Sequence, residues 1–404
     1  MASRGPIAYR PARVAGIPDR TAVGLDDAVQ ALVPEIRVAA DRVERDRRVP
    51  AELVAAIARA GIFRLCVPRT LGGLEVDPAT MVRALEALAA ADGATGWSAM
   101  IGATSGVASA YLPDAAAREI YADPETITGG AFAAFGKAIV VDGGYRVTGR
   151  WPFASGCEHC TWLMGGAVPI DHGTPRLLPN GMPDARLMLL PAREFRIIDT
   201  WTVAGLRGTG SHDIAVDDAF VPAGRSVSLV TDAPRATGAL YAFPVFGLLA
   251  LGICAVALGI ARAAIDELVR LALAKTPTGS RRRLADRPVL QVEVAEAEAI
   301  LGGARALVFD AIDAAWTMAS TAGAIDLRQR ARLRLAATHA TRSAARTVDL
   351  MYHAGGGTAV YATSPLQRHF RDVHVATQHV MVAPPTLELA GRLLLGLDAD
   401  TTML

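Results

Sequence analysis

Two glycine-containing turns carry the hydroxyl groups that this sequence places best for binding a small molecule. The first turn, Trp151–Cys160, sets Ser155 beside Gly156 between a strand-like run and an apolar run. The second, Trp201–Ser211, lies further along the chain and has the same character. Because glycine has no Cβ, such turns let a backbone approach a flat ligand closely. The alternative, which turn chemistry alone favours, is that both are ordinary loops at strand ends.

A CxxC pattern, Cys157 to Cys160, lies inside the first turn. A zinc site would need a second ligand pair, and the sequence offers no matching one. A redox motif of this spacing begins a helix in a thioredoxin-like unit, and that context is missing. Four cysteines in 404 residues are too few for a disulfide framework. We expect no metal site, and redox use of the pair is the lesser alternative.

Charge and hydropathy limit the classes of partner. A net charge of +1 gives no basic footprint for nucleic acid or for an anionic membrane. Residues 1–19 lack the apolar core of a signal peptide, so we expect a cytoplasmic protein. Ala239–Ala261 has no charged residue and is long enough to span a bilayer. Pro244 and several glycines interrupt it, which favours a helix buried in a bundle or a subunit interface.

The chain divides into three stretches that differ in their helix and strand patterns. Residues 1–124 indicate an N-terminal helical domain, residues 125–233 a small β domain, and residues 234–404 a C-terminal helical bundle. Asp142-Gly143-Gly144 predicts a hairpin in the β domain, which also holds both glycine turns. The helices of the bundle are expected at residues 244–273, 286–321, 326–354, 365–381 and 385–395.

Several motifs, taken in order, resemble the acyl-CoA dehydrogenase fold. They are Pro50-Ala-Glu-Leu53, Asp92-Gly-Ala-Thr-Gly-Trp97, Phe153-Ala-Ser-Gly156, Gly205-Leu-Arg-Gly-Thr-Gly-Ser211 and Leu366-Gln-Arg-His-Phe-Arg-Asp372. The resemblance covers nearly the whole chain from about Leu25 onward. It implies an α+β fold with an N-terminal helical domain, a central β-barrel-like domain and a C-terminal four-helix bundle. It also implies a flavin held between the β domain and the bundle, in a homotetramer.

One position separates two chemistries of this fold. Many acyl-CoA dehydrogenases remove a substrate proton with a glutamate in a Tyr-Glu pair soon after the Arg-Asp of the last bundle segment. Counted from Arg371-Asp372, that pair falls on His379 and Val380, and a valine cannot remove a proton. Other dehydrogenases carry the glutamate on an earlier bundle helix. Asp266 or Glu267 therefore keeps an acyl-CoA dehydrogenase or oxidase as the alternative.

The sequence is more similar to a second branch of the fold, the oxygenase components of two-component flavin-dependent monooxygenases. That branch includes hydroxylases of 4-hydroxyphenylacetate, dibenzothiophene and steroid phenols. Its members take reduced FMN or FAD from a separate flavin reductase and react it with O2 to form a C4a-hydroperoxyflavin. Its pattern of Arg-Asp followed by Thr/Ser-x-His matches Arg371-Asp372 and Thr377-Gln-His379. The resemblance implies that Ser155 hydrogen-bonds the flavin near N5 and that His379 lies near its C4a side.

The same resemblance implies the remaining contacts. The residues expected around the flavin ring and phosphates are Phe153, Ser155, Trp201, Leu206, Thr209, Gly210 and Ser211. Arg283, Gln291 and Arg371 are expected to reach the flavin of a neighbouring subunit, or else to serve the surface or an interface.

The substrate pocket is expected beside Trp97 and Ser105. Some phenol hydroxylases of this branch carry a further histidine in the helix after that tryptophan, and residues 98–112 contain none. The reaction is therefore left open among aromatic hydroxylation, N-hydroxylation, sulfur oxidation and natural-product oxygenation.

Overall fold

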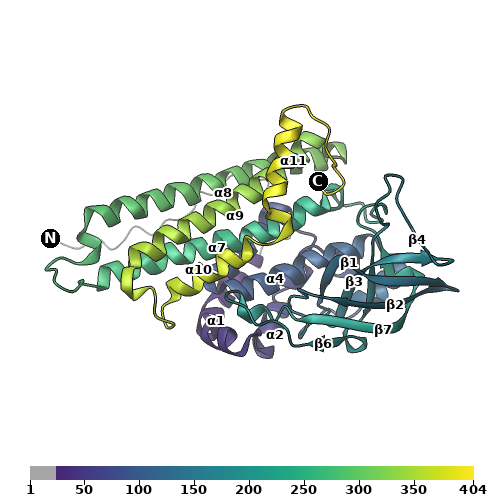
Figure 1. Cartoon of the computed structure of the whole chain (residues 1–404), viewed down its shortest axis with the longest axis horizontal. Helices are drawn as coiled ribbons and strands as arrows, with labels where there is room; N and C mark the ends of the chain where they lie inside the picture. Colours follow the sequence, from purple (N-terminus) through teal and green to yellow (C-terminus); the bar gives the residue numbers. More distant parts are fainter. Residues whose placement is uncertain (1–23) are drawn as a thin grey trace.

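The computed structural model describes residues 24–404 and shows an elongated molecule, with long helices at one end and a β-sheet at the other (Figure 1). The expectation about a signal peptide concerns residues that lie outside this described range. The shorter N-terminal helices, coloured purple to blue, pack along the long helices at the end next to the sheet (Figure 1).

The N-terminal part is helical, as the sequence predicts. Its helices are α1 (Leu25–Asp46), α2 (Ala51–Arg59), α3 (Pro78–Ala91), α4 (Gly93–Ser105) and α5 (Asp114–Tyr121), with 3-10 turns at Ile62–Arg64, Arg69–Leu71 and Gly106–Ala110. Aspartate caps start the two central helices: the side chain of Asp77 accepts from the N–H of Thr80, and that of Asp92 accepts from the N–H of Thr95. The second cap fixes the start of α4, the helix that carries Trp97.

The β domain is a mixed eight-stranded sheet in the order β6-β7-β2-β1-β3-β5-β8, with β4 paired to β3. The strands are β1 (Thr128–Val141), β2 (Gly144–Trp151), β3 (Trp162–Asp171), β4 (Thr174–Pro175), β5 (Arg186–Pro191), β6 (Arg196–Ile198), β7 (Asp213–Pro222) and β8 (Ser226–Val227). The predicted hairpin is confirmed, because Val141 at the end of β1 pairs with Gly144 at the start of β2.

Trp151 anchors the end of β2 in a pocket made by glycines. The side chain is fully buried, and its Nε1–H donates to the carbonyl of Gly166 at 2.6 Å. A Cβ on Gly136 or Gly165 would lie 2.4 or 2.7 Å from the indole ring, so these strand positions have room only for glycine. The first glycine turn therefore leaves the sheet from a fixed point.

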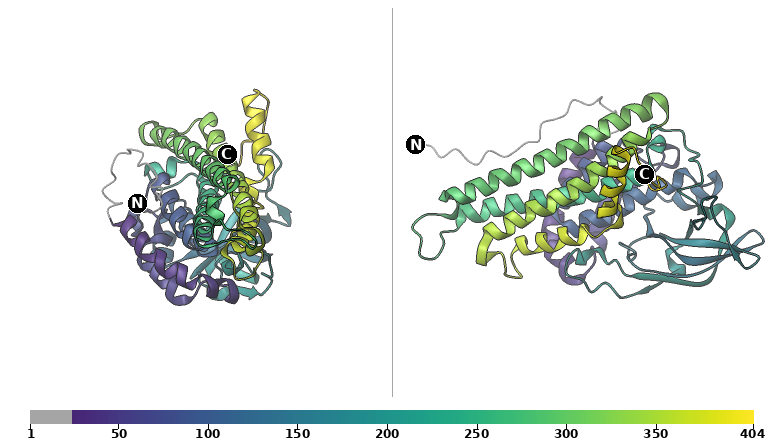
Figure 2. Two further views of the ribbon diagram at one scale, coloured as in Figure 1. Left: turned by 90° about the vertical axis from the view of Figure 1, so that its left-hand side faces the viewer. Right: turned by 45° about the horizontal axis from the view of Figure 1, so that its top comes forward.

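The C-terminal part contains α6 (Ala239–Ala242), α7 (Val245–Ala274), α8 (Pro288–Ala322), α9 (Leu327–Gly355), α10 (Pro365–Ala376) and α11 (Pro384–Leu394), with 3-10 turns at Leu284–Asp286, Gly356–Thr358 and Val380–Val382. The long helices α7, α8 and α9 run side by side, and α10 packs on α7 and α9 (Figure 2). The prediction of one helix over residues 365–381 is wrong. Helix α10 ends at Ala376, and the chain turns before the short 3-10 helix η9, Val380–Val382.

Helix α7 is the apolar segment that the sequence marked as long enough for a membrane. Its mean hydropathy over the most apolar window is 2.3, and 83% of that window is buried inside the fold. A Cβ on Gly259 would lie 2.4 Å from the Glu86 carbonyl of α3, and one on Gly252 would lie 2.8 Å from Met100 of α4. The glycines thus let α3 and α4 pack directly on α7, which is the buried bundle helix that the sequence favours.

Candidate functional site

The two glycine turns form one wall, because they are hydrogen-bonded to each other. The N–H of Gly156 donates to the carbonyl of Thr209 at 2.8 Å, and the N–H of Ala154 donates to the carbonyl of His212 at 3.1 Å. Phe153, in the same turn, has a left-handed backbone with φ 63° and leaves 69% of its side chain exposed. Its ring meets that of Trp201 edge to face at 6.1 Å. The wall therefore presents aromatic surface to solvent beside buried hydroxyl groups.

A chain of hydroxyl groups runs through this wall. The indole N–H of Trp97 donates to Ser155 Oγ at 3.1 Å. Ser155 Oγ lies 2.7 Å from Ser211 Oγ, which lies 2.6 Å from Thr209 Oγ1. Thr209 Oγ1 donates to the carbonyl of Leu206 at 2.8 Å. All these side chains are buried, so helix α4 and both turns are joined by bonds that water does not compete for.

Helix α10 holds the second turn in place through Asp372. The N–H of Leu206 donates to Asp372 Oδ1 at 2.6 Å, across 166 residues of sequence. Burial raises the pKa of Asp372 to about 7, the N–H of Leu206 opposes that rise, and the nearby Asp92 and Glu44 add to it. A Cβ on Gly205 would lie 2.3 Å from the carbonyl of Arg371, so the turn passes directly over α10. The Arg-Asp motif of the sequence includes Asp372, but the hydrogen bond from Leu206 to this carboxylate was not predicted.

His379 faces the same wall from the end of the bundle. Its ring centroid lies 5.8 Å from that of Trp97, whose indole also binds Ser155. The N–H of Met381 donates to His379 Nδ1 at 3.2 Å, which leaves the ring proton of the neutral form on Nε2. Burial, aided by the charge of Arg334, lowers the pKa of His379 to about 4. The histidine is therefore neutral at pH 7, where its Nε2–H can donate a hydrogen bond to a ligand but does not release a proton.

Arg334 supports the loop that carries His379, and sequence reasoning missed it. The side chain is only 4% exposed and donates to the carbonyl of Met381 at 3.0 Å and to the carbonyl of Met403. Burial lowers its pKa to about 10. A buried arginine on a bundle helix has no local sequence signal, because its partners come from distant segments.

Ser105 does not point into open space. Its Oγ donates to the carbonyl of Thr128 at 2.7 Å and lies 2.9 Å from Thr128 Oγ1, so it ties α4 to β1. The Ser105 proton is thus used inside the fold, and contact of Ser105 with the substrate stays a prediction. Ser98, next to Trp97, is 3% exposed, and its hydroxyl has no hydrogen-bond partner among the described residues. It is the unpaired polar group on α4 that sequence reasoning passed over.

The three predicted inter-subunit contacts lie in two places. Arg283 and Gln291 are exposed near the α7–α8 loop, at the end of the bundle away from the sheet (Figure 1). Arg283 pairs with Asp286 at 3.2 Å, and Gln291 Nε2 donates to the carbonyl of Ala285 at 3.0 Å. Within one chain they do not join the wall, and contact with a neighbour's flavin stays a prediction.

Arg371 lies at the wall itself. It donates to the carbonyl of Ala204, to Gln367 Oε1 at 2.7 Å and to Glu44 Oε1 at 2.9 Å. The bond to Ala204 holds the first part of the second turn on α10, and the bond to Glu44 ties α10 to α1. A flavin contact of Arg371 stays a prediction.

The cysteines of the first turn are buried thiols. Burial raises the pKa of Cys157 to about 12 and raises that of Cys160 as well, so neither is a thiolate at neutral pH. Cys157 Sγ lies 3.5 Å from the carbonyl of Gly210, the other turn. Among residues 24–404 no group of three His, Cys, Asp or Glu side chains gathers to hold a metal ion. Cys157 thus packs the two turns together, whereas Cys160 Sγ packs against Gly129 of β1.

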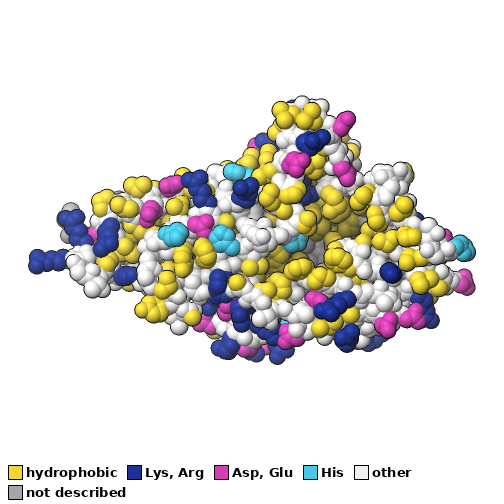
Figure 3. All heavy atoms as spheres, in the orientation of Figure 1, with side chains coloured by type: hydrophobic (Ala, Val, Ile, Leu, Met, Phe, Trp, Pro, Cys, Tyr) yellow, Lys and Arg dark blue, Asp and Glu magenta, His cyan; other side chains and the backbone are white. Residues whose placement is uncertain are grey.

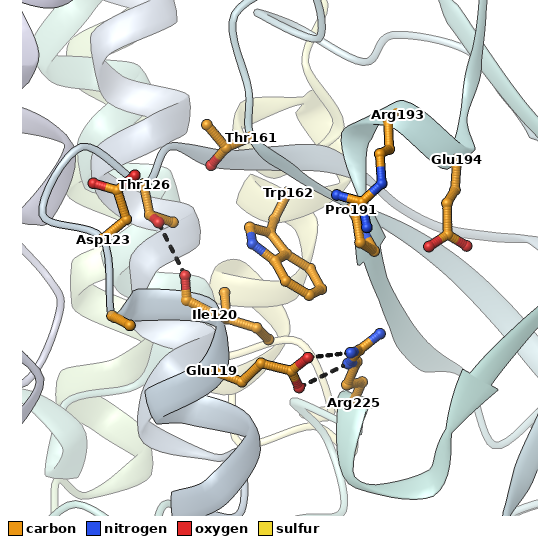
Figure 4. Close-up of a pocket in the computed structure, with 11 residues that line it drawn as sticks. Glu119, Ile120, Asp123, Thr126, Thr161, Trp162, Pro191, Arg193, Glu194 and Arg225 are labelled. Carbon is orange, nitrogen blue, oxygen red and sulfur yellow. Dashed lines mark hydrogen bonds and ion pairs between the residues drawn. The ribbon is translucent and has the colours of Figure 1, made fainter.

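Hollows in the surface of the molecule lie beside the β domain. In the space-filling view, hydrophobic side chains gather around a hollow between α11 and the β domain, and a histidine lies at its edge (Figure 3). A separate cavity of about 410 Å³ opens between α5 and the β domain (Figure 4). There the Arg225 guanidinium lies 5.0 Å above the Trp162 ring and pairs with Glu119. No residue of the hydroxyl chain lines that second cavity.

Comparisons with known proteins agree with this architecture. The model of the acyl-CoA dehydrogenase N-terminal domain matches residues 24–119, and that of the acyl-CoA dehydrogenase C-terminal domain matches residues 251–384. Indole-3-acetate monooxygenase of Pseudomonas putida is 34% identical over 93% of this chain and 95% of its own length.

Two solved structures are similar over almost the whole chain. The HsaA monooxygenase of M. tuberculosis has 32% identity and a TM-score of 0.87, and covers 95% of this chain and 100% of its own. XiaF from Streptomyces, in complex with FADH2 and glycerol, has 28% identity and a TM-score of 0.85, covering 94% and 98%. The chain therefore belongs to the flavin-dependent monooxygenases of the acyl-CoA dehydrogenase fold, as an oxygenase component that works with reduced flavin and O2.

Proposed function

We propose that this chain oxygenates a small aromatic molecule, with the flavin ring held against the wall formed by the two glycine turns. The observation that carries the proposal is the buried hydroxyl chain that ends at Ser155, next to Trp97 and His379. We further propose that a separate reductase supplies the reduced flavin in the cytoplasm. FAD is the favoured form, because the similar XiaF structure contains FADH2.

The described residues fit a flavin at this wall. The exposed Phe153 and the half-buried Trp201 offer flat apolar surface of the kind that a ring system covers. Ser155 Oγ uses one acceptor position for Trp97 and keeps capacity for a ligand. Leu206 and Gly210 have left-handed backbones, which shape the second turn around its hydroxyl groups. Reduced flavin bound here supplies the two electrons that activate O2.

We propose that His379 keeps oxygenation coupled to flavin oxidation by offering a fixed hydrogen bond, and that it does not act by releasing a proton. A ring whose pKa is about 4 carries no extra proton at pH 7, so it brings no stray acid to the flavin. Its Nε2–H is free to donate a fixed hydrogen bond, because Nδ1 accepts from Met381. A donor held in a fixed position stabilises developing charge without the cost of reorganising solvent.

The substrate is proposed to lie on the His379 side of Trp97. An aromatic substrate is supported by the name of the Pseudomonas putida relative, an indole-3-acetate monooxygenase. Ser98, on the same helix as Trp97, adds a buried hydroxyl that has no partner within residues 24–404, and we propose that it contacts the substrate. Substrates with a hydroxyl or ring N–H can satisfy this group.

We also propose a homotetramer in which Arg283 and Gln291 reach a neighbour's flavin. Both residues are exposed at the end of the bundle remote from their own wall. Val289 and Val292, on the same stretch of α8, are 71% and 65% exposed. Exposed valines beside exposed polar groups support a contact surface at this end of the bundle.

An acyl-CoA dehydrogenase base finds no support on α7. Asp266 pairs with Arg262 at 3.0 Å, and Glu267 pairs with Arg270 at 2.6 Å. Val380, at the position of the dehydrogenase glutamate, is 73% exposed and has no acid–base chemistry.

The experiment supplies chemically reduced FAD or FMN and O2 to the purified protein with a panel of indoles and phenols. We expect an oxygenated product with reduced flavin and none with oxidised flavin. Acyl-CoA thioesters serve as the second panel under anaerobic conditions. Bleaching of oxidised flavin by a thioester, with no aromatic product, would overturn the proposal.

A further inference from the structure

The hydrogen bonds along the hydroxyl chain all run in one direction. The carbonyl of Leu206, at one end of the chain, sets that direction. The carbonyl of Leu206 can only accept, so the single proton of Thr209 Oγ1, 2.8 Å away, points toward it. Thr209 must then accept from Ser211 at 2.6 Å, and Ser211 must accept from Ser155 at 2.7 Å. The opposite direction would leave the Thr209 and Leu206 oxygens 2.8 Å apart with no proton between them.

The end that fixes this direction is itself held rigidly. Leu206 donates its N–H to Asp372 at 2.6 Å and has a left-handed φ of 50°. Its carbonyl also accepts the indole N–H of Trp201 at 3.1 Å and the N–H of Thr209 at 3.2 Å. The carbonyl therefore stays in place as an acceptor whether or not a ligand is bound.

With this direction, the Ser155 hydroxyl keeps one hydrogen-bonding position that no protein group occupies in the described structure. The Ser155 proton goes to Ser211, and one lone pair receives the indole N–H of Trp97 at 3.1 Å. A hydroxyl oxygen has two lone pairs, so the remaining function is that of an acceptor. Ser155 can thus accept a hydrogen bond from a ligand but has no proton to give it.

This distinction matters for a flavin, because N5 changes character with oxidation state. In the reduced ring N5 carries a hydrogen and donates, whereas in the oxidised ring N5 only accepts. We propose that Thr209, acting through Ser211, fixes Ser155 as an acceptor and so makes this site select reduced over oxidised flavin. The inference rests on the proposed placement of the flavin N5 edge at Ser155. Thr209 and Ser211 are specificity-determining residues in this account, and their effect reaches the flavin through Ser155.

The test measures dissociation constants for oxidised and reduced FAD and FMN, under anaerobic conditions, in the wild-type protein and three variants. Thr209→Val keeps the side-chain shape but removes the acceptor for Ser211. Ser211→Ala interrupts the chain next to Ser155. Thr174→Val changes an exposed threonine on strand β4, outside both turns, and is the matched control.

We expect the wild-type protein to bind reduced flavin more tightly. The ratio of the oxidised to the reduced dissociation constant should fall on the order of tenfold in both chain variants, because Ser155 regains a proton to donate. The midpoint potential of the bound flavin should fall correspondingly, by about 30 mV for each tenfold change. Thr174→Val should keep the wild-type ratio.

The outcomes separate this inference from the proposed function. Chain variants that bind flavin with the wild-type ratio would refute the selection mechanism and leave the flavin site standing. If the variants bind oxidised and reduced flavin more weakly by the same factor, Thr209 and Ser211 only contribute to flavin binding, and the selection mechanism is refuted. A wild-type protein that binds neither form would overturn the flavin site and this inference with it. Ser211→Ala leaves the Leu206 turn intact, so it decides the matter if Thr209→Val does not fold.

Discussion

Asp372→Asn tests how the second turn is held, because this carboxyl is buried and accepts the N–H of Leu206 at 2.6 Å. Asparagine keeps the shape and an acceptor oxygen but cannot ionise. The folded-state pKa of Asp372 is raised by burial from 3.8 to about 7. Between those values the folded protein holds a proton that the unfolded chain has lost.

The free energy of unfolding of the wild-type protein should therefore carry a contribution that falls as pH rises through this window. One such group contributes about 1.4 kcal/mol per pH unit. The variant lacks it, so its stability relative to wild type should rise by about that amount per unit between pH 5 and 7, and level off above pH 7. The histidines whose pKa burial lowers to about 4, namely His159, His369 and His379, act equally in both proteins and cancel.

The assay is urea unfolding at a series of pH values from 5 to 8, with Asp142→Asn on the exposed β1–β2 turn as the control for losing one carboxyl group. A difference between Asp372→Asn and wild type that does not change with pH would refute the reasoning. It would mean that Asp372 ionises in the fold as it does in the unfolded chain.

Three further predictions concern the wall and its supports. Ser155→Ala and His379→Ala should each raise the hydrogen peroxide released per reduced flavin consumed, while Ser320→Ala, at an exposed position of α8, should not; unchanged coupling in both site variants would refute their roles. Because the pKa of His379 is about 4, coupling in the wild-type protein should show no step from this residue between pH 5.5 and 8, and a step near pH 6.5 that vanishes in His379→Ala would contradict its neutral state. Arg334→Met should destabilise the fold by about 1–3 kcal/mol, since it leaves the carbonyl of Met381 unpaired; an unchanged melting temperature would show that the carbonyl finds another donor.

The first glycine turn was predictable because its signals are local. A strand-like run, a glycine and a serine stand next to one another in the sequence, and the structure builds the turn from those residues. That the second turn lies against it was foreseen only through the resemblance. The bonds that join the two turns link segments far apart in the sequence. One is the bond from Gly156 to Thr209, and another is the bond between Ser155 and Ser211, which are 56 positions apart.

His379 shows where helix patterning misleads. The apolar spacing over residues 365–381 continues a helix in the sequence, yet α10 ends at Ala376. The side chain of His379 then caps the short helix η9 by accepting from the N–H of Met381. This tertiary arrangement, rather than local propensity, brings the ring to Trp97.

Ser105, Ser98 and Arg334 mark the limit of residue-type reasoning. In a helix of small residues the serines look equivalent, and only the contact of Ser105 with Thr128 on β1 shows which hydroxyl is used for packing. The unpaired Ser98 and the buried Arg334 depend on what other segments place around them. Burial and partner identity are properties of the fold, so these assignments needed the structure.

The most direct measurement of the central claim uses isotopically labelled O2. Reduced FAD, 18O2 and an accepted indole or phenol are combined with the wild-type protein, and the product is analysed by mass spectrometry. The account predicts one 18O atom in the product, formed with little hydrogen peroxide in the wild-type protein and with much more in Ser155→Ala. A product without 18O, or equal coupling in the two proteins, would contradict it.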